Sequence, residues 1–218
     1  MLFACRWQKV SFLYKKDKNQ LKSCFYLKKV LSLPEIIERM TFDKINEKLY
    51  AVREKGRKDN VLYNLFEQWY DVKYLYDFFS RHTDVLQSYF HISGIRQAVS
   101  DTIEDVEYLE DVLIGLTVDN LDAVFKHLSP KDEGIVFLSR HKARNWERRN
   151  HDSWLRIYAL RLEGGVYVIT GGAIKMSQKM QDDPETKKQL QKINECKAYL
   201  KGLIYDVEGL EELIDAQN

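Results

Sequence analysis

Cysteine and proline are scarce in this chain, with three of each among 218 residues. The cysteines (Cys5, Cys24 and Cys196) are too few and too far apart for a disulfide framework or a zinc site, so a reducing, cytoplasmic setting is expected. The scarcity of proline and glycine excludes a collagen-like chain, and 44% hydrophobic residues exclude a fully disordered one. The composition is that of a globular protein able to bury a core.

Long hydrophobic runs are also lacking, since none reaches the roughly 18 residues that suggest a membrane span. Residues 1–10 begin apolar, but neither a long apolar region nor a small-residue cleavage site follows, so no signal peptide is expected. The phosphate loop, the G-x-S-x-G elbow and C-x-x-C are absent, and His82, His91 and His127 lack metal-ligand spacing. Neither a metal nor a cofactor is therefore expected.

The 34 Lys/Arg and 33 Asp/Glu nearly cancel, so only the distribution of charge informs on partners. Residues 1–39 hold nine bases and three acids and precede Met40, which reads like a natural start. We expect 1–39 to be an upstream read-through or a disordered basic arm, with a nucleic-acid-binding arm as the alternative, and 40–218 to form one α+β domain. Residues 96–135 carry ten acids, and residues 139–180 carry nine bases, a clustering that phosphate binding requires.

Apolar residues spaced three and four apart predict the helices of a helical section over 60–128. One stripe runs through 62–79, and a second runs through 95–113 with acids on its outer face. A short helical piece is expected at 84–90 and a third helix at 121–128. The acidic face is interpreted as solvated surface; docking of a basic partner, or masking of the basic section, is the alternative.

Strand formers predict a sheet section over 134–180, preceded by a short strand at 48–53. The sheet section contains an apolar strand at 134–138 and a hairpin of 154–162 with 166–170 around a Gly-rich turn. The double glycine that follows ends or bulges the second strand of the hairpin.

A terminal helix is expected over 183–201, with Asp183 as its N-cap, Pro184 as its first residue and Cys196 as a small buried apolar residue. The order of elements predicts an α+β fold. N-terminal and central helices are followed by a small antiparallel β-sheet, which helices cover on one side, and by a C-terminal helix.

Side chains alternate along the predicted strand 154–162, which places Arg156 and Tyr158 together on the face opposite the core. A guanidinium beside a phenol suits phosphate binding and base stacking; an exposed Arg–aromatic contact is the alternative. Lys175 and Lys179 follow the double glycine, where their ammonium groups could hold phosphate or stabilise developing negative charge. Solubilising edge charges are the alternative there.

Two histidines flank the basic loop. His151 is a candidate general acid near neutral pH, although a loop histidine often has no catalytic role. Between His141 and His151 lie Arg144, Arg148 and Arg149, which we predict to bind RNA together with Lys179.

The stretch Ser153–Leu200 resembles the C-terminal half of the RelE/HigB-like toxins of bacterial type II toxin–antitoxin modules. Those proteins carry a strand with arginine and tyrosine, a short turn, an aliphatic strand, a G-x-x-K-x-x-x-K stretch and a helix often opened by proline. The matching segments here are Arg156-Ile157-Tyr158, Glu163-Gly164-Gly165, Val166-Tyr167-Val168-Ile169, Gly172 to Lys179, and Pro184-Glu185-Thr186. The match covers about 50 of the 218 residues.

The resemblance implies a RelE-like topology, with an enlarged helical section, and a metal-independent endoribonuclease that cleaves mRNA on the ribosome. It also implies a cytoplasmic protein held inactive by a cognate antitoxin, commonly a helix-turn-helix protein. Arg156 and Lys175 would stabilise charge, Tyr158 would stack on a base or transfer a proton, and His151 would be the general acid. A non-enzymatic nucleic-acid- or protein-binding module of the same fold is the alternative, and a helical interaction protein is a third.

Overall fold

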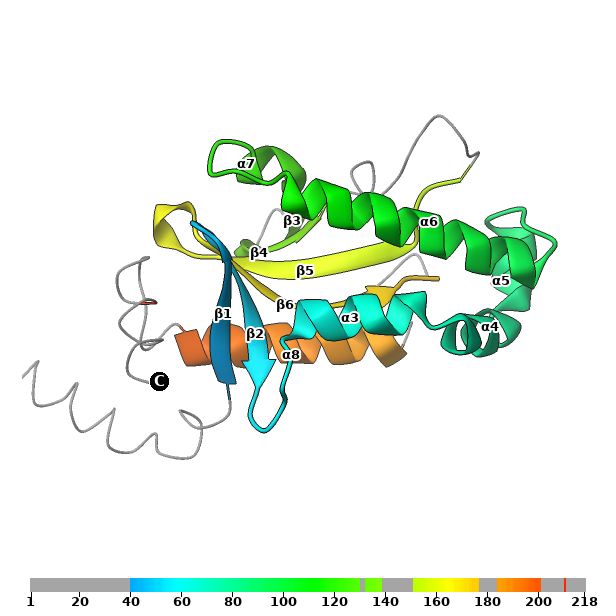
Figure 1. Cartoon of the computed structure of the whole chain (residues 1–218), viewed down its shortest axis with the longest axis horizontal. Helices are drawn as coiled ribbons and strands as arrows, with labels where there is room; N and C mark the ends of the chain where they lie inside the picture. Colours follow the sequence, from blue (N-terminus) through cyan, green and yellow to red (C-terminus); the bar gives the residue numbers. More distant parts are fainter. Residues whose placement is uncertain (1–39, 130–131, 139–150, 177–183, 201–209, 211–218) are drawn as a thin grey trace, which may run out of the picture. The chain divides into compact units, whose positions relative to one another are not determined.

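The computed structural model describes residues 40–129, 132–138, 151–176, 184–200 and residue 210. In chain order (Figure 1) the elements are β1 (Met40–Asn46), β2 (Leu49–Glu54), α3 (Val61–Tyr70), α4 (Val72–Ser80), α5 (Thr83–Ser88), α6 (Ile95–Ile114), α7 (Leu121–Val124), β3 (Phe125–Ser129), β4 (Asp132–Leu138), β5 (Leu155–Arg161), the 3₁₀ turn η3 (Glu163–Gly165), β6 (Tyr167–Ile174) and α8 (Pro184–Leu200). The predicted α+β class and C-terminal helix are confirmed.

The strands form one six-stranded sheet in the order β1-β2-β6-β5-β4-β3. Neighbouring strands are antiparallel except β2 and β6, which pair in parallel from Leu49–Tyr167 to Ala51–Ile169. The sheet is therefore mixed rather than wholly antiparallel. The sheet is mixed because β2, the second strand of the N-terminal hairpin, lies beside β6. Parallel pairing requires a long connection between the two strands, and the chain between β2 and β6 provides it.

Helices cover both faces of the sheet, not one face as expected. A side chain added at Gly171 would meet Gln189 of α8, whereas one added at its neighbour Gly172 would meet Leu65 and Trp69 of α3. Successive residues of a strand point to opposite faces, so α8 and α3 lie on opposite sides of β6. The buried residues Ile193, Cys196 and Leu200 of α8 need a sheet face to cover them, and α3 and α6 already cover the other face.

The apolar stripe over 62–79 belongs to two helices rather than one. The chain breaks at Asp71, whose carboxylate accepts hydrogen bonds from the backbone N–H groups of Lys73 and Tyr74 and so caps α4. The predicted residues Trp69 of α3 and Phe79 of α4 are buried in the core, whereas Val72 and Tyr76 of the same stripe are exposed.

The third predicted helix is wrong beyond Val124, because strand β3 begins at Phe125. The ring of Phe125 stacks on that of Tyr167 at 5.0 Å between centroids, and β3 pairs with β4. Strand pairing and burial therefore override the local helical pattern.

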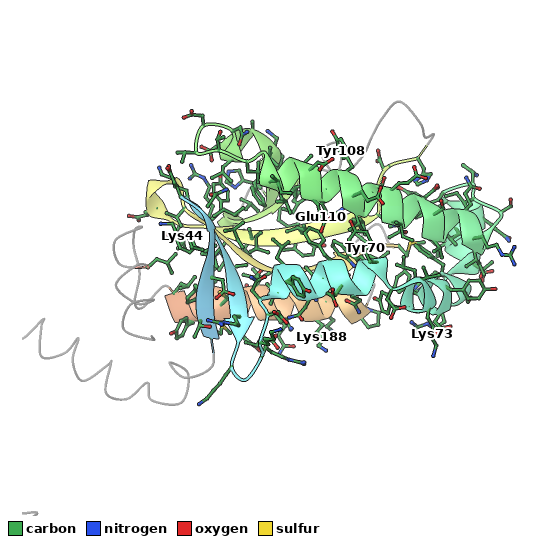
Figure 2. The ribbon with its side chains drawn as sticks, viewed as in Figure 1. Lys44, Tyr70, Lys73, Tyr108, Glu110 and Lys188 are labelled. Carbon is green, nitrogen blue, oxygen red and sulfur yellow. The ribbon has the colours of Figure 1, made fainter. Side chains whose placement is uncertain are left out.

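The acids of α6 do not all lie on its outer face. Asp101 and Asp105 are buried, one turn apart, while Glu110 accepts a hydrogen bond of 2.6 Å from the Tyr70 hydroxyl. Figure 2 shows Tyr70 and Glu110 between α3 and α6. Part of the acidic surface expected from the sequence is thus used inside the protein.

Cys196 is buried, as predicted, and burial raises the pKa of its thiol to about 12. A thiol held neutral in this way is a poor nucleophile, so Cys196 is a packing residue.

Candidate functional site

The hairpin of β5 and β6 carries two of the residues singled out from the sequence, Arg156 and Tyr158, and Lys175 follows directly after β6. It turns through η3, where Gly164 and Gly165 both have φ of 73°, a conformation that favours glycine. The strands pair from Arg161–Tyr167 to Leu155–Ile174, and Thr170 is bulged out between Ala159–Ile169 and Tyr158–Gly171. The hairpin and the bulge beside the double glycine are therefore confirmed.

The pairing places Arg156, Tyr158 and Lys175 on one face of the sheet. Arg156 lies opposite Ala173 and Tyr158 lies opposite Gly171, while Lys175 follows two residues after Ala173. The alternate residues of both strands belong to the core beneath α3 and α6, so these three side chains point to the α8 face.

The burial of this face differs from the expectation. Arg156 is 8% exposed and Tyr158 is 1% exposed, whereas Lys175 is half-buried. The Arg156 Nη1 group donates to the carbonyl oxygens of Ser153 at 2.7 Å and Leu155 at 2.6 Å. The expected open strand face is wrong for Arg156 and Tyr158, because α8 covers the same side of the sheet.

His151 lies on the other side of the sheet, against α6. Its Nε2 atom is 3.0 Å from the Asp101 carboxylate, and its ring stacks on Trp154 with centroids 4.7 Å apart. The indole of Trp154 donates to Thr102 at 2.9 Å, which fastens the start of β5 to α6 a second time.

Both ring nitrogens of His151 are engaged within the protein. The Nδ1 atom is 3.0 Å from the Asp152 carbonyl oxygen, which can only accept, so Nδ1 donates there. Nε2 lies against the Asp101 carboxylate, so both ring nitrogens have partners among the described residues. His151 therefore serves to hold the start of β5, and the sequence-based role of general acid does not fit its surroundings.

The predicted RNA-binding residues, namely Arg144, Arg148, Arg149 and Lys179, lie outside the described residues, as does His141.

A second polar cluster joins α7 to the hairpin. The Asp122 carboxylate accepts hydrogen bonds from the Tyr167 hydroxyl and from Arg161 Nε, the latter at 3.1 Å. These bonds, that of Tyr167 first, hold the pKa of Asp122 below its ordinary value. Burial, followed by the bond to Asp122, raises the pKa of Tyr167 to about 12. The cluster borders a pocket of about 380 Å³ that Lys48 also lines.

Replacing Asp122 with asparagine is expected to make the protein less sensitive to acid. A carboxyl with a lowered pKa in the folded state contributes stability above its ordinary pKa of roughly 4, and that contribution is lost as the pH falls through the lowered value. Because Asp122 is 67% exposed, the effect is modest, at most about 1 kcal/mol. Urea unfolding at neutral pH and at low pH should show a smaller difference for Asp122→Asn than for the wild type. Asp119→Asn, in the turn before α7, is the control, and equal pH sensitivity of Asp122→Asn and the wild type would contradict the assignment.

Two residues that position the site were missed from the sequence. Asp101 holds His151 from 50 positions away, and the carbonyl of Ser153 accepts from Arg156. A signal for Asp101 was present, because Ala98, Asp101 and Asp105 recur at helical spacing on the buried face of α6. No feature of the sequence around Ser153 indicates that its backbone carbonyl accepts a hydrogen bond from Arg156.

Across the described ranges, no group of three or more His, Cys, Asp or Glu side chains is arranged to hold a metal ion. The helices in these ranges also include none with the length and apolar character needed to cross a membrane.

The described residues thus define an α+β protein with a mixed six-stranded sheet and polar groups buried on both faces. Comparison with protein-family models, with curated proteins and with solved structures finds no match for the chain.

Proposed function

We propose that this protein is the toxin component of a toxin–antitoxin pair that acts on mRNA, as an endoribonuclease associated with the ribosome. The observation that carries the proposal is the pairing of β5 with β6. It sets Arg156 of β5 opposite Ala173 of β6, two residues before Lys175. Two cations on neighbouring strands suit the phosphates of an RNA backbone.

RNA can be cleaved without a metal ion when protein side chains stabilise the charge that develops on the phosphate. The ribose 2′-hydroxyl gives up its proton to water acting as a base, and its oxygen bonds to the adjacent phosphorus. The bond from phosphorus to the 5′-oxygen of the next nucleotide breaks, and water protonates that oxygen, which gives a cyclic phosphate and a free 5′-hydroxyl. Negative charge builds on the phosphate oxygens in between. Lys175 and Arg156 would stabilise that charge, and Lys175, being the more exposed of the two, would make the direct contact.

A non-enzymatic binding module of the same fold is the second candidate, and one observation favours it. Tyr158 is buried and both His151 nitrogens are engaged, so neither presents a proton-transfer group to bound RNA. Such a module would grip a nucleic acid or an acidic protein through its cations without cleaving it.

Incubation of the full chain with mRNA, with and without ribosomes, distinguishes the two candidates. The toxin proposal expects cleavage that increases strongly when ribosomes are present and is lost in Lys175→Ala. Binding of intact RNA without cleavage under both conditions would support the binding module instead. Because the proposed reaction uses no metal ion, addition of a chelator should leave the cleavage measured without ribosomes unchanged.

The proposed partner is a cognate antitoxin. A neighbouring gene for a small helix-turn-helix protein favours the toxin, and an isolated gene favours the binding module. Co-expression of such a neighbour is expected to suppress growth arrest by this chain.

A further inference from the structure

A polar crevice of about 250 Å³ lies where the parallel strands β2 and β6 separate. Their pairing ends at Ala51 and Ile169, and Thr170 bulges out of β6 immediately afterwards. The chain runs from β2 to α3 on one face of the sheet and from β6 towards α8 on the other face. In sheets with parallel strands, a crevice at the carboxyl ends of such a pair is a common ligand site.

The groups that line the crevice suit a small ring with polar edges. Gln68 of α3 and Gln189 of α8 supply carboxamides, each of which carries both a donor and an acceptor. Asn64 of α3 adds an acceptor oxygen, since its amide nitrogen donates to backbone carbonyls before α3. Val61 and Leu65 add apolar surface beside them. Carboxamides recognise the edges of nucleobases by pairing a donor and an acceptor with them. The volume of the crevice lies below the roughly 300–1,000 Å³ typical of sites for drug-sized ligands.

Positive charge gathers at the same place. Lys192 Nζ donates to the Glu54 carboxylate at 2.6 Å, and Arg57 and Lys188 act on the same carboxylate. The hydrogen bond from Lys192, together with the three cations, holds the pKa of Glu54 below its ordinary value. Figure 2 shows Lys188 on α8, well away from Lys73 on α4. Among the residues that line the crevice, the two cations Arg57 and Lys192 outnumber the one carboxylate, Glu54, which leaves an excess of positive charge for an anion.

We propose that this crevice binds a nucleotide, with its base among the carboxamides of α3 and α8 and its phosphate at Arg57 and Lys192. None of the crevice residues belongs to the set proposed for RNA cleavage, so the site stands independently of that proposal. The ligand could be a free mononucleotide or one unit of an RNA strand, because both offer the same base and phosphate.

Calorimetric titration of the full chain with AMP, GMP, CMP, UMP and inorganic phosphate tests the site. At least one nucleotide is expected to bind at millimolar concentration or below, and more tightly than phosphate does. Arg57→Ala and Gln68→Ala, both at exposed positions, should each weaken binding by about tenfold, while Lys73→Ala should not. No binding of any nucleotide, or binding unchanged in both crevice variants, would overturn the proposal.

Glu54→Gln is expected to change the affinity for nucleotides in the opposite direction. Removal of the carboxylate releases Lys192 and removes a repulsion, so nucleotide binding should become tighter, whereas a crevice without an anion would show no gain. A short single-stranded RNA that displaces the nucleotide would identify a strand unit as the occupant, and lack of displacement would identify a free nucleotide. If Arg57→Ala weakens nucleotide binding but still arrests growth, the nucleotide site and the proposed toxin activity are independent of each other.

Discussion

Lys175→Ala is expected to abolish growth arrest and to slow cleavage of ribosome-bound mRNA by about 100-fold or more, the effect of removing a group that stabilises developing charge. Lys175 is half-buried at the end of β6, where its backbone N–H donates to the Trp154 carbonyl at 2.8 Å. The substitution keeps that backbone bond, so the variant should remain folded, with its free energy of unfolding lowered by about 1 kcal/mol. A growth assay, the cleavage assay and urea unfolding measure the three quantities.

Lys187→Ala is the matched control, since Lys187 is an exposed cation on α8. It should arrest growth as the wild type does. If Lys175→Ala arrests growth normally when equally expressed, the charge-stabilising role of Lys175 is wrong. Arg156→Ala is less informative because Arg156 is buried and bonded to Ser153 and Leu155, so its loss changes stability as well as activity.

Gly172→Ala is expected to destabilise the protein more than any exposed substitution. The added methyl group would lie 2.4 Å from the Arg156 carbonyl oxygen and 2.9 Å from Leu65 Cδ1, so backbone as well as side chain would have to move. Overpacking of this kind costs about 1–3 kcal/mol, and each kcal/mol lowers the Tm of a domain of this size by about 2–4 °C. Thermal unfolding followed by circular dichroism measures the shift.

Gly94→Ala is the control for the glycine substitution, because a methyl group there has no neighbour within 4 Å. Its Tm should stay close to that of the wild type. A Tm for Gly172→Ala equal to that of Gly94→Ala would show that β5 and β6 are packed less tightly than described.

The elements with strong periodicity could be predicted from the sequence. The hairpin of β5 and β6 follows from strand formers around a glycine turn, and α6 follows from apolar residues at helical spacing. In contrast, β1 was not predicted, and β3 was predicted as helix. Both are edge strands of the sheet, and their conformation depends on a neighbouring strand rather than on their own residues.

The candidate site could be predicted only in part. Alternation along β5 and β6 correctly gave the shared face of Arg156 and Tyr158. Burial of that face could not be predicted, because it depends on where α8 packs. The partner of His151 was missed, although Asp101 shares the helical spacing of the buried residues of α6, because the acids of that helix were expected to face solvent.

The parallel pairing of β2 with β6 has a consequence for synthesis of the chain. Leu49 finds its strand partner only at Tyr167, so the β1–β2 hairpin leaves the ribosome long before the strand that completes it. Until then the free side of β2 is an unpaired edge, open to another nascent chain. Pairing over such a separation also slows folding, so the yield of native protein should depend on the rate of translation between these two strands.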